Sequence, residues 1–150
     1  MREPHTCAAG RCAGHQQSPQ FRRVHERKAT GVDRERRWVL LQPQVCAVGH
    51  TDQQARDAGL DARSVAYPAG DVPGAYTLGD AVSGTSRLVV EQRRRILVGA
   101  TFTGPGMQEP LHSATIAIAG KVTLEQLWHA VPAFPTVSEV WLHLLEAHGL

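Results

Sequence analysis

The pattern of apolar and polar positions divides this chain near Trp38. Residues 1–37 carry few large apolar side chains, and such a segment cannot bury enough surface to offset the entropy that ordering would cost. We therefore predict that residues 1–37 are disordered. From residue 38 onward, apolar positions recur with strand and helix periodicities, which predicts one folded domain over residues 38–150.

Four segments have the composition of strands: residues 38–49, 63–67, 87–91 and 95–103. The first is an apolar run that Pro43 interrupts. The last two flank a polar turn, which is the pattern of an antiparallel hairpin. Residues 68–84 are rich in Gly, Pro and Asp, so we predict a long loop there that carries a short strand at residues 75–78.

Four segments have the periodicity or the capping residues of helices: residues 52–58, 107–120, 124–131 and 137–148. Thr51 stands as an N-cap before the first. Thr123 and Thr136 each begin a capping box, because Gln126 and Glu139 follow three residues later. The order of strands and helices predicts an α+β fold in which the helices pack on one face of an antiparallel sheet.

Three motifs are more specific than this pattern, and they lie at residues 43–49, 96–105 and 132–139. The first reads Pro-Gln-Val-Cys-Ala-Val-Gly, the second ends in Gly-Pro, and the third reads Pro-Ala-Phe-Pro-Thr-Val-Ser-Glu. Together they resemble the C-terminal dimerisation (interface) domain of the pyridine nucleotide-disulfide oxidoreductases, a family that includes dihydrolipoamide dehydrogenases and mercuric reductases. The resemblance covers residues 38–150. It implies FAD and NAD(P) as cofactors of a complete enzyme, and a homodimer formed through the C-terminal helices.

The third motif aligns with the family's catalytic dyad. The resemblance implies a histidine that reaches the partner's flavin, oriented by the motif's glutamate. Here Phe134 stands at the histidine position, and phenylalanine exchanges no proton. Glu139 keeps the glutamate position, where its capping role is the stronger interpretation and catalysis the alternative. His129, near the end of a predicted helix, is an alternative base, although the helix dipole gives it an ordinary structural role.

Two further expectations concern cofactors and metals. The resemblance implies that the backbone of Phe134 and Pro135 turns toward the partner's flavin. Cys7 and Cys12 have the spacing of the family's redox disulfide, but no Gly-x-Gly-x-x-Gly turn opens a helix in this chain, which argues against that role. Their spacing to nearby histidines matches no common zinc finger, so we predict no metal site. Cys46 falls in a predicted buried strand and should act as a small hydrophobe.

Charge and cysteine content narrow the class of protein. The net charge of +2 hides an asymmetry, because residues 1–37 hold nine Lys/Arg against four Asp/Glu. This basic segment raises a nucleic-acid-binding alternative, but it lacks interleaved aromatic residues, which favours a solvated run. No apolar run is long enough to span a bilayer. Three cysteines do not make a disulfide framework, so we expect a cytoplasmic protein.

The sequence therefore predicts an isolated or truncated dimerisation domain of an FAD-dependent NAD(P)H oxidoreductase. The parent enzyme would be dihydrolipoamide dehydrogenase-like, or a quinone- or diaphorase-type reductase because Phe134 replaces the proton relay. We expect no flavin binding and no turnover by this chain alone. The alternative is a non-catalytic homodimerising interaction domain, in which Trp128, Val131, Phe134 and Trp141 are partly buried against a second copy.

Overall fold

The structure is a computed structural model that describes residues 37–39, 45–79 and 82–150. The described residues belong to one compact unit, Asp33–Leu150. The predictions of disorder and of basic character for residues 1–36 lie outside the described residues, as do those for Cys7 and Cys12. For the rest of the chain, the expected α+β fold with an antiparallel sheet is confirmed.

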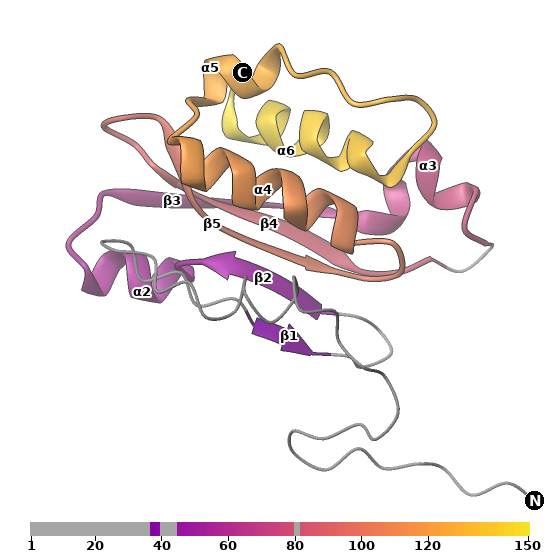
Figure 1. Cartoon of the computed structure of the whole chain (residues 1–150), viewed down its shortest axis with the longest axis horizontal. Coiled ribbons are helices and arrows are strands. Elements are labelled where there is room, and N and C mark those ends of the chain that lie inside the picture. The colour runs from indigo at the N-terminus through magenta and orange to yellow at the C-terminus, as the bar shows by residue number, and fades with distance from the viewer. Residues whose placement is uncertain (1–36, 40–44, 80–81) are drawn as a thin grey trace, which may run out of the picture. The chain divides into compact units, whose positions relative to one another are not determined.

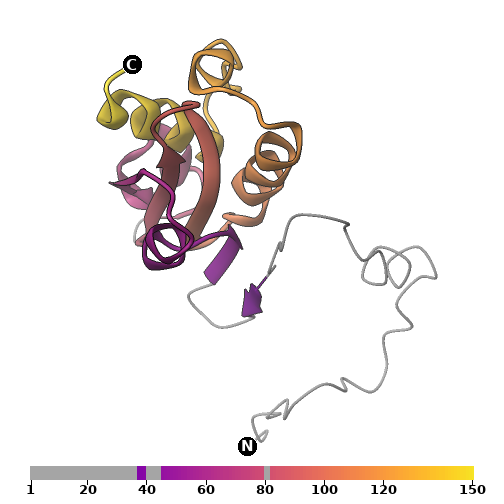
Figure 2. The same ribbon diagram turned by 90° about the vertical axis from the view of Figure 1, so that its left-hand side faces the viewer.

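Five strands form one sheet in the order β1-β2-β5-β4-β3, and every neighbouring pair is antiparallel (Figure 1). The strands are β1 (Arg37–Val39), β2 (Val45–Gly49), β3 (Ala62–Pro68), β4 (Thr85–Glu91) and β5 (Ile96–Thr103). The predicted hairpin is the pair β4–β5, joined by a turn at residues 92–95. Figure 2 shows this hairpin as two long, strongly twisted strands beside helix α4.

Two details of the strand prediction are wrong. Residues 38–49 do not form one interrupted strand, because β1 and β2 pair with each other as antiparallel neighbours. The strand expected at residues 75–78 is also absent from the described part of the chain, which there forms the short helix α3 (Pro73–Tyr76) after a 3-10 turn, η1 (Ala69–Asp71). Pro73 favours this helix because its ring presets the backbone at the first helical position.

The longer helices follow the predicted positions. They are α2 (Asp52–Asp57), α4 (Gln108–Gly120), α5 (Leu124–Trp128) and α6 (Val140–His148), which the 3-10 turn η2 (Val137–Glu139) precedes. The capping box of α2 is formed: the amide of Gln54 donates to Thr51 Oγ1 at 3.2 Å, and the amide of Thr51 donates to Gln54 Oε1 at 2.8 Å. Among the described residues, no helix is both long and apolar enough to cross a membrane.

The core lies between one face of the sheet and the helices α4 and α6. Val48, Ala100, Leu88 and Val65 stand opposite one another across four successive strands, and all four are buried. Helix α4 packs on β5 and β2, and α6 packs on β3 and β4, so both helices cover this face (Figure 1). The predicted packing of the helices on one face is confirmed for α4 and α6.

His148, the last residue of α6, is buried against the β4–β5 turn. Its Nε2 lies 3.1 Å from Nε2 of Gln92, and its backbone carbonyl accepts from Arg63 at 3.3 Å. Because the Gln92 amide nitrogen is a donor, His148 Nε2 accepts and the ring is neutral. Burial lowers the pKa of His148, and the positive charges of Arg63 and Arg95 lower it further, while Glu125 acts in the opposite direction.

This lowered pKa predicts a loss of stability in mild acid. The unfolded chain, whose histidine has an ordinary pKa of about 6.5, binds the proton more readily than the folded domain. The contribution of His148 is therefore complete above that pH and declines as the pH falls toward the lower folded pKa. We expect urea midpoints to fall between pH 7.5 and pH 5.5, and to fall less in His148→Gln. An equal fall in both proteins would contradict this assignment.

Candidate functional site at the terminal loop

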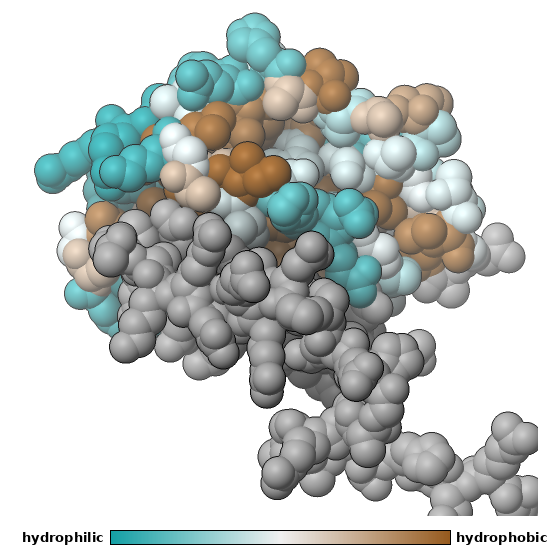
Figure 3. Space-filling view, viewed as in Figure 1, coloured by the Kyte–Doolittle hydropathy of each residue, from teal (hydrophilic) through white to brown (hydrophobic). Residues whose placement is uncertain are grey.

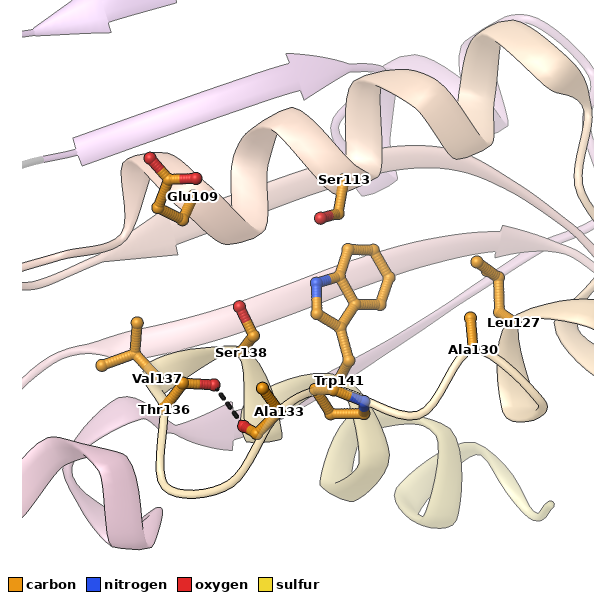
Figure 4. A pocket seen from close by; sticks show the side chains of 10 residues that line it. Glu109, Ser113, Leu127, Ala130, Ala133, Thr136, Val137, Ser138 and Trp141 are labelled. Atoms are coloured by element: carbon orange, nitrogen blue, oxygen red, sulfur yellow. Dashed lines mark hydrogen bonds between the residues drawn. The ribbon is translucent and has the colours of Figure 1, made fainter.

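The terminal motif forms a loop between α5 and α6 that is held against α3. Glu139 fixes this arrangement, because its Oε2 accepts from the backbone amide of Thr136 at 3.2 Å and from the amide of Gly74 at 3.0 Å. Only 8% of Glu139 is exposed. Thr136 also donates its hydroxyl to the carbonyl of Ala133 at 2.6 Å, a bond drawn in Figure 4. The carboxylate thus closes the loop on itself and ties it to a helix far away in sequence.

Gly74 lets the two backbones come this close. A Cβ atom at this position would lie 2.0 Å from the carbonyl carbon of Thr136 and 2.2 Å from its carbonyl oxygen. No heavy-atom contact of that length is sterically possible, so glycine is required where α3 meets η2. Sequence reasoning missed Gly74 as a partner of Glu139. The Pro-Gly pair at residues 73–74 marks a turn in the sequence but not the residue that it contacts.

The candidate catalytic residues are not brought together. Phe134 is 76% exposed at the tip of the loop, whereas the carboxylate of Glu139 is buried and accepts from two backbone amides. His129 is exposed at the C-cap of α5, and no hydrogen bond joins it to Glu139 in the described structure. Glu139 therefore has the geometry of a structural acceptor, and the described residues form no acid–base dyad at this motif.

The peptide bond between Phe134 and Pro135 is cis. This agrees with the conformation that the resemblance implied for the loop. Val131, which we expected on the apolar face of α5, lies beyond the end of that helix and is 74% exposed. Trp141 is only 7% exposed and packs on Phe102 within its own domain, with the ring centroids 5.9 Å apart. Exposed apolar surface on the loop therefore comes from Val131 and Phe134.

A cleft of about 410 Å³ lies between α4 and the loop. Figure 4 shows the indole of Trp141 between Ser113 on α4 and Ala133 on the loop. Apolar side chains form most of the wall, and Glu109 contributes a carboxylate from the first turn of α4. The cleft therefore suits a neutral, mainly apolar occupant.

Metal and thiol chemistry find little support in the described part of the chain. Within residues 37–39, 45–79 and 82–150, no group of three or more His, Cys, Asp or Glu side chains is placed to hold a metal ion. Cys46 is buried in β2, and burial raises the pKa of its thiol, which keeps it protonated and unreactive. The expectation that Cys46 is a small core hydrophobe is confirmed.

Comparison with known proteins agrees with the fold and the loop geometry. Dihydrolipoyl dehydrogenase from Geobacillus stearothermophilus is 29% identical over 108 residues, which cover 72% of this chain and 23% of the relative. Mercuric reductase from Staphylococcus aureus is 29% identical over 101 residues, covering 67% and 18%. The chain thus spans less than a quarter of the length of these relatives.

Solved structures show the same fold. The HOCl-induced flavoprotein disulfide reductase RclA from Escherichia coli superposes with a TM-score of 0.67 at 24% identity, over 75% of this chain and 26% of the reductase. A model of the pyridine nucleotide-disulphide oxidoreductase dimerisation domain matches residues 36–145. The chain therefore belongs to the pyridine nucleotide-disulphide oxidoreductase family, of which it carries the dimerisation domain.

Proposed function

We propose that this chain is the homodimerising part of an FAD-dependent NAD(P)H oxidoreductase, as an isolated or truncated domain, and that alone it binds neither cofactor. The observation that carries this proposal is the terminal loop. Glu139 keeps the loop folded through two backbone amides, while Phe134 occupies the position of the family's proton-transferring histidine. The loop thus retains a scaffold without an acid–base group.

The described residues do not fit a complete flavin site. Phosphate groups of dinucleotides are bound by a glycine-rich turn at the start of a helix, and no Gly-x-Gly-x-x-Gly turn opens a helix in this sequence. Phe134 is exposed at the loop tip together with Pro135, where the two residues could contribute only an edge to a flavin held elsewhere. Chemistry at FAD and NAD(P) is therefore assigned to the rest of a complete enzyme.

For that enzyme, the nature of residue 134 bears on the electron acceptor. Reduction of a disulfide by a dithiol mechanism requires a proton relay beside the sulfur atoms, and Phe134 supplies none. An acceptor such as a quinone or an artificial dye takes electrons from reduced flavin without that relay. We therefore favour a quinone- or diaphorase-type parent over a dihydrolipoamide dehydrogenase-like one. The cysteine content supports a cytoplasmic location.

The cofactor part of the proposal is tested by spectroscopy of the purified full chain. After incubation with FAD and removal of free flavin, we expect no flavin absorbance and no oxidation of NADH or NADPH with a quinone or with lipoamide. A complete dihydrolipoyl dehydrogenase treated in parallel provides the positive control. Flavin bound at one equivalent per chain would overturn this proposal.

The second candidate is a non-catalytic homodimerising interaction domain. Its support is the exposure of two large apolar side chains, Val131 and Phe134, on the loop between α5 and α6. Both candidates share the homodimer and differ in whether a flavin-binding partner exists. Co-expression with a flavin-binding protein of the family distinguishes them: retention of flavin in a co-purified complex favours the first candidate, and a homodimer without that partner favours the second.

A further inference from the structure

Two exposed apolar side chains project from the rim of the cleft beside α4. Val131 is 74% exposed and Phe134 is 76% exposed, and we call this pair the loop knob. Between them, Pro132 and Ala133 line the cleft itself, so the knob stands directly at its edge. Figure 3 shows that apolar residues form separate patches on the side that carries α4 and α6. Exposed apolar groups of this size are typical of interaction surfaces.

The cleft has the chemistry to receive such a knob. Its walls include the apolar side chains of Leu127, Ala130, Val137 and Trp141. The indole Nε1 of Trp141 is buried and has no hydrogen-bond acceptor among the described residues. Buried polar groups nearly always have a partner, so an unpartnered N–H beside an open cleft indicates that the site is completed from outside.

The loop and the cleft are complementary in charge as well as in polarity. Residues 131–135 carry no charged side chain, so they can approach Glu109 without placing a second carboxylate beside it. The loop also carries backbone carbonyl oxygens, which are the acceptors that the indole N–H lacks. Because knob and cleft lie side by side, a two-fold axis near the rim brings the knob of each copy to the cleft of the other.

We propose that the loop knob of one copy of this chain docks in the cleft of a second copy, in a reciprocal two-fold contact. This inference rests on the homodimer of the proposed function and assigns the surface that forms it. The contact buries Val131 and Phe134 on both sides and supplies an acceptor for Trp141. The occupant of the cleft is thus a second copy, not a small molecule.

The test compares self-association of the full chain with that of the double variant Val131→Ser/Phe134→Ser. Both side chains are exposed, so these substitutions leave the core intact, which far-ultraviolet circular dichroism verifies. The matched control is Ile116→Ser, which removes another exposed apolar side chain, 57% exposed on α4, that does not line the cleft. Sedimentation velocity over a concentration series gives each dissociation constant, and the indole N–H resonance of Trp141 reports on the cleft.

We expect the double variant to associate at least about tenfold more weakly, as when apolar anchors of an interface are truncated, and Ile116→Ser to associate like the native chain. The Trp141 resonance should shift with protein concentration in the native chain and stay fixed in the double variant. A double variant that dimerises like the native chain would overturn the knob contact but leave the homodimer standing. A native chain that stays monomeric would overturn both.

Discussion

Gly74→Ala is expected to destabilise the domain by about 3 kcal/mol or more, which is a large part of the stability of a typical domain. The added methyl would lie 2.0 Å from the carbonyl carbon of Thr136, so α3 and η2 must separate. Separation also breaks the bond from the Gly74 amide to Glu139. Chemical denaturation of the purified variant measures this loss.

The matched control for this prediction is Gly120→Ala. Gly120 is the last residue of α4, and a Cβ there would meet only the Val122 side chain, at 3.2 Å. Alanine also has the higher helix propensity, so this variant should stay within about 1 kcal/mol of the native chain. Equal stability of the two variants would show that α3 does not pack on Thr136 as described.

Glu139→Ala is expected to cost about 2–3 kcal/mol, because two buried backbone amides lose a charged acceptor. Both amides, those of Thr136 and Gly74, bond to the same carboxylate oxygen. Glu139→Gln keeps an oxygen at the end of a side chain of equal length, so it should lose less. Urea denaturation at neutral pH measures both variants. Native stability in Glu139→Ala would contradict the structural role of this residue.

Local sequence patterns predicted the elements that depend on local chemistry. The capping boxes at Thr51 and Thr123 are formed, because each box involves only residues three apart. The β4–β5 hairpin follows from two apolar runs around a polar turn. Helix α3, with four residues, is too short to show a helical period, and its position depends on packing against η2. The pairing of β1 with β2 likewise depends on register, which an interrupted apolar run does not reveal.

The candidate site was predictable in its residues but not in its contacts. Aligning the terminal motif identified Phe134 and Glu139, and the capping interpretation of Glu139 is confirmed by its bond to Thr136. The second bond, to Gly74, joins residues 65 positions apart, and no local pattern predicts it. The burial of Trp141 and the exposure of Val131 also follow from where α5 ends and α6 packs.

Sedimentation equilibrium of the full chain tests the central claim most directly, namely that this domain forms a homodimer without cofactors. The chain has a mass of 16.3 kDa. In the absence of FAD and NAD(P), we predict a concentration-dependent approach to twice that mass, with no higher species. A single species of 16.3 kDa at every concentration, up to the highest that stays in solution, would contradict the account.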